Sequence, residues 1–195
     1  GGAKTLLSQP HRHLQAAGVG ELAVRPADSA PWNLQKAAWL GLMTGRTLTG
    51  IRMNDILRGL DALKELGIAT DRGVLAVAKG NLGPALLHAA VVDERIGPVI
   101  VEESLVSFQA VAAAPIHHNL EDVIVPGVLG QYDLPDLAAA LAPRKVVLMN
   151  LRAPTGRLLL RKEAREAYSA VSGANIQIGL RKEGEPWQES YRQSF

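Results

Sequence analysis

Residues 75–90 read LAVAKGNLGPALLHAA, and the change of pattern inside this stretch decides the fold. Its first residues continue an apolar run from Val74, which is typical of a strand buried on both faces. Lys79, Gly80 and Asn81 interrupt the run with a turn, and apolar residues resume after Gly83 over the length of a helix. The stretch predicts a buried strand, a sharp glycine-rich turn and a helix, an arrangement at which many α/β enzymes place reactive groups.

Short apolar runs alternate with longer helical patterns along the whole chain. The runs predict strands, and apolar residues at three- and four-residue spacing predict the helices between them. The predicted strands are 20–24, 73–78, 97–103, 145–150 and 175–180, and the predicted helices are 4–17, 49–66, 83–92, 133–141 and 157–172. Segment 25–48 is predicted to be a loop leading into a helix, and 104–132 is a long connection of the kind that shapes binding sites. We therefore expect the α/β class, as a three-layer α/β/α domain with a mostly parallel sheet.

Composition limits the classes of function. The chain has 195 residues, 47% of them hydrophobic, which favours a single domain over residues 1–195. It has no cysteine, which excludes disulfides, thiolate nucleophiles and cysteine-bound metals. A net charge of +2 with both signs interspersed argues against a nucleic-acid partner. No apolar run reaches the ~18 residues of a membrane span, and the start lacks the order of a signal peptide, so we expect neither a membrane partner nor a targeting signal.

The order of these elements carries a family resemblance. Residues 51–66 (IRMNDILRGLDALKEL), the strand and turn at 75–90, and the tracts 88–108 and 125–150 succeed one another in an order that resembles the α/β-hydrolase superfamily. More narrowly, the chain is similar to the acetyl xylan esterase and prolyl oligopeptidase-like group of bacterial hydrolases, from about residue 14 to about 180. The tract YDLPDLAAALAPRKVVLMN (132–150) is the most specific part, because in this group a helix ending in Ala-Pro-Arg precedes the strand that the catalytic acid follows. The resemblance implies a partial α/β-hydrolase fold.

The same resemblance implies that the catalytic triad is missing. Residues 78–83 (AKGNLG) lie where the group has G-H-S-x-G-G, so the nucleophile position falls on Gly80, which has no oxygen. The backbone N–H of Asn81 would remain as an oxyanion donor. Residues 151–156 hold no carboxylate, and residues 180–195 hold no histidine. We therefore expect a degenerate hydrolase-like domain that binds, scaffolds or is a remnant of a hydrolase.

Completion of the sheet is a further expectation from the resemblance. The family has a strand before the helix at 4–17, and the few residues that precede that helix here leave no room for a full strand. The sequence begins GGAKTLL without methionine, which indicates a processed, trimmed or tagged start to a larger fold. We therefore expect either a completing polypeptide segment or a homo-oligomer as partner, because unpaired central strand edges are unstable.

One alternative is a hydrolase of the esterase or phosphotriesterase type with unconventional groups, acting on a small-molecule ester. Lys79 in a desolvated turn can act as a base or nucleophile, and Glu102 or Glu103 can orient a histidine. His117 and His118 lie in the long connection that follows these glutamates. The histidines have neither H-x-H nor i, i+4 spacing, so no metal is predicted.

A second alternative is a dinucleotide-binding domain. Ala78-x-Gly80-x-x-Gly83 resembles G-x-G-x-x-G without its first glycine, and Glu102 follows 22 residues after Gly80, near where a ribose-binding acid belongs. The fingerprint normally belongs to the first strand of its fold, whereas about 70 residues precede it here. The main reading therefore includes no cofactor.

Overall fold

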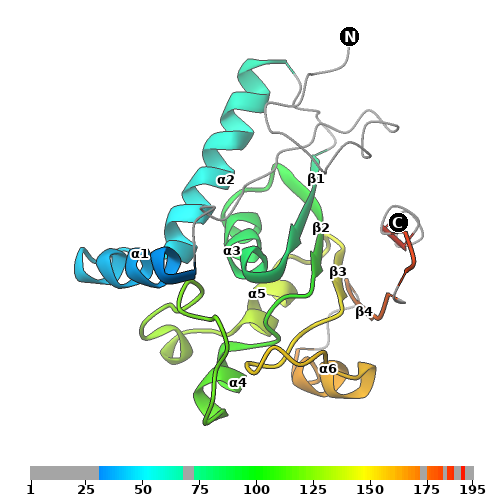
Figure 1. The fold of residues 1–195 in the computed structure, drawn as a ribbon. Coiled ribbons are helices and arrows are strands. Elements are labelled where there is room, and N and C mark those ends of the chain that lie inside the picture. Colours follow the sequence, from blue (N-terminus) through cyan, green and yellow to red (C-terminus); the bar gives the residue numbers. More distant parts are fainter. Residues whose placement is uncertain (1–30, 68–72, 172–174, 182–183, 187–189, 192–195) are drawn as a thin grey trace.

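The computed structural model describes residues 31–67, 73–171, 175–181, 184–186 and 190–191. Within these ranges helices alternate with short strands (Figure 1). The elements in chain order are α1 (Pro31–Met43), α2 (Leu48–Glu65), β1 (Val74–Lys79), η2 (Gly80–Leu82), α3 (Gly83–Val92), β2 (Ile96–Glu102), α4 (Phe108–Ala113), η3 (Val128–Gly130), α5 (Leu134–Ala140), β3 (Val146–Met149), α6 (Arg161–Ala167) and β4 (Ile176–Gly179). The predicted helix at 4–17 and the predicted strand at 20–24 lie outside the described residues.

The four described strands form one parallel sheet in the order β1-β2-β3-β4. This confirms the α/β class and the four predicted strands that fall within the described ranges. Lys79 pairs with Glu102, and Glu102 pairs with Met149, so the carboxyl ends of the first three strands are level at one edge. A sheet whose strands follow in sequence order, joined by right-handed crossovers, carries its crossover helices on one face.

The core lies mainly on that helical face. Side chains that alternate along β2 and β3 face the helices and are almost fully buried with residues of α2, α3, α5 and α6: Val99, Val101, Val146, Leu148, Leu60, Ala85, Ala89, Leu137, Ala138 and Ala164. The intervening side chains, Ile100, Val147 and Met149, point to the opposite face and pack there with Tyr191. Strands buried on both faces explain why these runs are continuously apolar in the sequence.

Residues 132–150 form hydrogen bonds to the start of α4 and to the turn between α3 and β2. Asp133 is the N-cap of α5 and forms a capping box with Asp136. Its carboxylate also accepts from the backbone N–H groups of Phe108 at 2.6 Å and Gln109 at 3.0 Å, at the start of α4. Arg144 donates to the carbonyl oxygens of Ala90 and Ile96, both at 2.7 Å, which holds the turn between α3 and β2.

The structure differs from the prediction in two segments. The predicted helix at 157–172 begins only at Arg161, because Leu158 bridges Arg152 and the N–H of Leu159 donates to the carbonyl of Leu151. Glu163 accepts from the N–H of Leu160 at 2.7 Å and starts the helix there. Segment 25–48 contains a complete helix, α1, before α2 begins.

No described helix combines the length and apolar character that a bilayer crossing requires.

Candidate functional site

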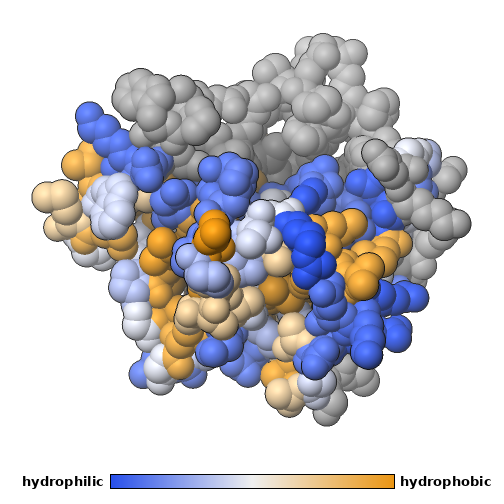
Figure 2. Space-filling view, turned by 60° about the horizontal axis from the view of Figure 1, so that its bottom comes forward, coloured by the Kyte–Doolittle hydropathy of each residue, from blue (hydrophilic) through white to orange (hydrophobic). Residues whose placement is uncertain are grey.

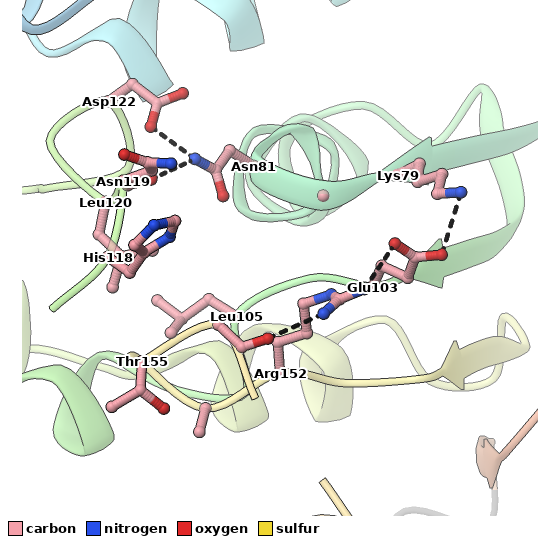
Figure 3. A pocket seen from close by; sticks show the side chains of 13 residues that line it. Lys79, Asn81, Glu103, Leu105, His118, Asn119, Leu120, Asp122, Arg152 and Thr155 are labelled. Carbon is pink, nitrogen blue, oxygen red and sulfur yellow. Dashed lines mark hydrogen bonds and ion pairs between the residues drawn. The ribbon is translucent and has the colours of Figure 1, made fainter. Parts of the chain in front are cut away.

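A pocket of about 600 Å³ lies at the carboxyl edge of the sheet. Its walls come from the end of β1 and the turn after it, from the segments that follow β2 and β3, and from the connection before Asp122 (Figure 3). Its lining residues are Lys79, Gly80, Asn81, Glu103, Leu105, His118, Asn119, Leu120, Asp122, Arg152, Ala153, Thr155 and Gly156. The surface toward this end of the molecule mixes hydrophilic and hydrophobic residues (Figure 2). This is where ligands bind in parallel α/β sheets.

The turn after β1 has the backbone of a sharp elbow. Lys79 is extended, with φ −122° and ψ 141°, and Gly80 then takes a left-handed φ of 63°. No atom outside its chain neighbours lies within 4 Å of where a Cβ of residue 80 would stand. A Cβ at Gly83 would instead lie 2.2 Å from Ser104 Oγ, so glycine there lets α3 pack against the segment after β2. A side chain at position 80 would therefore extend into open space, but glycine provides none.

Glu103 is held between two cations. Lys79 Nζ lies 3.0 Å from its Oε1, and Arg152 Nη2 lies 2.9 Å from its Oε2. Partial burial raises the pKa of Glu103, but the hydrogen bonds from Lys79 and Arg152 outweigh this effect and hold the pKa below its ordinary value. Arg152 also donates to the carbonyl of Gly156 at 2.8 Å. Glu103 is therefore a charged anchor that joins β1 to the loop after β3.

A buried ion pair supports the opposite wall. Arg52 of α2 donates from Nη1 to Asp122 Oδ2 at 2.6 Å, and Thr49 donates to the carbonyl of Asp122 at 3.3 Å. Asn81 donates from Nδ2 to Asp122 Oδ1 at 2.7 Å and to the carbonyl of Asn119 at 2.8 Å. The Asn81 side chain thus joins the elbow to the long connection.

Five of the predicted site residues meet in this pocket, namely Lys79, Gly80, Asn81, Glu103 and His118. His117 is not among the lining residues, and its Nε2 lies 2.8 Å from the carbonyl of Val111. Glu102 does not line the pocket either: it is the last residue of β2, whereas Glu103 follows the strand with a left-handed φ of 54°.

Glu102 belongs to a separate buried network and is 1% exposed. It accepts from Arg181 Nε at 2.6 Å, from the Tyr191 hydroxyl and from Asn150 Nδ2 at 3.3 Å. Burial and the hydrogen bond to Glu102 raise the pKa of Tyr191 above its ordinary value. The Glu102 carboxylate therefore has its hydrogen-bond partners within the protein and is not available to a ribose hydroxyl. This argues against the dinucleotide alternative.

Sequence reasoning missed Arg52, Asp122 and Arg152. Arg52 and Asp122 are 70 positions apart, and neither stands in a motif. Arg152 lies in residues 151–156, a segment that was considered only for a catalytic carboxylate, which it lacks. Among the residues that the structure describes, no group of three or more histidine, aspartate and glutamate side chains is placed to hold a metal ion.

Comparison with known proteins bears on the fold. No family model matches the chain, and no curated protein matches it either. The crystal structure of a proposed acetyl xylan esterase from Bacteroides fragilis matches with a TM-score of 0.60 and 18% sequence identity. The match covers 79% of this chain and 42% of that protein, so the chain spans less than half of its length. At this identity the likeness bears on the fold alone: a parallel sheet flanked by helices, consistent with a partial α/β-hydrolase-like fold.

Proposed function

We propose that this chain is a hydrolase-like domain without a catalytic triad, which binds a small molecule and does not hydrolyse it. The observation that carries the proposal is Gly80. It has the left-handed backbone of an elbow and open space in front of it, at the position where the family resemblance places the nucleophile. A glycine there can keep the turn while providing no oxygen for attack on an acyl group.

The surroundings of Gly80 support the same proposal. The loop after β3, where the resemblance places the acid, contributes the cation Arg152 to the pocket. The ring of His118 lines the pocket, and among the described residues no carboxylate is hydrogen-bonded to it to orient it. A base without an orienting partner and without a nucleophile beside it does not form a triad.

The second candidate is a hydrolase with unconventional groups, favoured by the presence of Lys79, Glu103 and His118 in one pocket. Lys79 Nζ is engaged by the Glu103 carboxylate at 3.0 Å and its side chain is 60% exposed, so Lys79 does not have the desolvated surroundings that activate a lysine for attack. The lowered pKa of Glu103 makes its carboxylate a weak base. We therefore rank this candidate second.

Hydrolysis of p-nitrophenyl acetate and of a phosphotriester separates the two candidates. The full chain would be compared with Lys79→Ala, Glu103→Gln and His118→Ala, with the exposed Lys64→Ala as matched control. We expect equal background rates in all five proteins. Turnover above background that falls at least about tenfold in one pocket variant, while Lys64→Ala is unchanged, would establish the hydrolase.

The proposal extends to the partner of the sheet. β1 is one of the two edge strands of the described sheet, and we propose that a further polypeptide segment or a second copy of the chain completes the fold beside it. If a second copy does so, light scattering should give a mass above 20.8 kDa for the chain in solution. A monomer that unfolds cooperatively and with ordinary stability would contradict this part of the proposal.

A further inference from the structure

Positive charge exceeds negative charge where Lys79 and Arg152 meet Glu103. The two cations share one carboxylate, at 3.0 Å and 2.9 Å, so these three side chains together carry one net positive charge. The Lys79 side chain is 60% exposed and that of Arg152 is 39% exposed, so both can also reach a ligand. This side of the pocket therefore favours an anion.

The other carboxylate of the lining does not cancel this charge. Asp122 is paired with Arg52 at 2.6 Å, and both side chains are buried. Its second oxygen accepts from Asn81. The Asp122–Arg52 pair is neutral as a unit, so the pocket as a whole retains the net positive charge.

The elbow adds space and backbone polarity at the same place. The turn Gly80–Leu82 leads directly into α3, whose N-terminal end carries a partial positive charge. No side chain at position 80 fills the space in front of this turn. Leu105 and Leu120 (Figure 3), together with Ala153, give the pocket an apolar wall.

We infer that the pocket binds a small organic monocarboxylate, with its carboxylate group near Gly80 on the exposed side of Lys79 and Arg152 and its apolar body against Leu105 and Leu120. The inference rests on the proposed binding function and names its ligand class. One net positive charge matches a monoanion, whereas a phosphate dianion would leave excess negative charge. The apolar wall requires a body that a bare inorganic anion does not have.

The test is a ¹⁵N NMR titration of the full chain with three probes: hexanoate, its neutral analogue hexanamide, and inorganic phosphate. We expect hexanoate to shift the amide signals of Gly80 and Asn81 in a saturable manner. Hexanamide should bind at least about threefold more weakly, the effect of one partly exposed charge pair. Phosphate should also bind more weakly, because it makes no contact with the apolar wall.

Two substitutions test the role of charge: one removes a positive charge from the pocket and the other removes a negative charge. Lys79→Met should weaken hexanoate binding by about threefold or more, and Glu103→Gln should strengthen it by a similar factor, since it removes the negative charge that competes for both cations. Lys64→Met removes an exposed lysine of α2 outside the pocket lining and should leave hexanoate binding unchanged. Lys79 is largely exposed, so its substitution tests binding without endangering the fold.

Equal binding of hexanoate and hexanamide would overturn the inference, as would phosphate binding as tight as that of hexanoate or a loss of affinity in Lys64→Met equal to that in Lys79→Met. Absence of binding by hexanoate would also overturn it, while leaving the proposed lack of hydrolysis intact. Conversely, ester turnover that depends on a pocket side chain would refute the proposed function, and the titration would still show whether the pocket takes a carboxylate.

Discussion

Replacing Asp122 by alanine should leave the guanidinium of Arg52 buried and without its carboxylate. The two side chains are only 7% and 2% exposed, and their charged atoms lie 2.6 Å apart. Removing one partner of such a buried pair costs about 3–5 kcal/mol, because the remaining charge has lost both water and its counter-ion. Asn81 would lose an acceptor as well. We expect the free energy of unfolding to fall by about 3–5 kcal/mol.

Urea unfolding followed by circular dichroism measures this change, with the slope against urea as a check that the denatured state is unaltered. The matched control is the double variant Arg52→Met/Asp122→Leu, which removes both charges and keeps apolar bulk. It should be more stable than Asp122→Ala, since apolar replacement of a whole buried pair is often nearly neutral. A loss below about 1 kcal/mol in Asp122→Ala, or a double variant less stable than Asp122→Ala, would refute the reasoning.

Two further predictions concern the elbow and its ion pairs. Gly83→Ala should lower the free energy of unfolding by about 1–3 kcal/mol, because its Cβ would lie 2.2 Å from Ser104 Oγ. Adding Ser104→Ala should recover part of this loss, as measured by thermal unfolding. An unchanged melting temperature in Gly83→Ala would contradict this packing. Glu103 has a folded-state pKa below its ordinary value of 4.5, so its ionised form adds stability above pH 4.5 that is lost as pH falls through the folded-state pKa. Urea unfolding at about pH 6 and about pH 3 should therefore show a smaller difference in Glu103→Gln than in the unaltered protein, and an equal or larger difference would contradict the assignment.

The sheet could be predicted because its signals are local. The run 97–101 is continuously apolar, short and rich in β-branched residues, which is typical of a buried strand. The glycines at 80 and 83 indicated a sharp turn before α3, and the left-handed φ of Gly80 agrees with it. The late start of α6 did not follow from periodicity, because Leu158 and Leu159 pair with Arg152 and Leu151, which lie earlier in the same loop after β3.

The candidate site was only partly predictable for a related reason. Lys79, Gly80 and Asn81 are adjacent in sequence and mark one turn, whereas the wall opposite depends on Arg52 meeting Asp122 across 70 positions. Glu102 and Glu103 are also adjacent, yet the strand ends between them and the left-handed φ of 54° at Glu103 directs its side chain to the pocket while that of Glu102 joins a buried network.

The most direct measurement of the central claim is the intact mass of the full chain after incubation with a fluorophosphonate, with an active serine hydrolase as positive control. Such reagents phosphonylate an activated nucleophile, and the proposed function assigns the nucleophile position to Gly80, which has no side chain to label. We predict that the mass stays that of the unmodified chain while the control is fully labelled. Stoichiometric labelling of this chain, mapped to any side chain that lines the pocket, would contradict the claim that the elbow has lost its nucleophile.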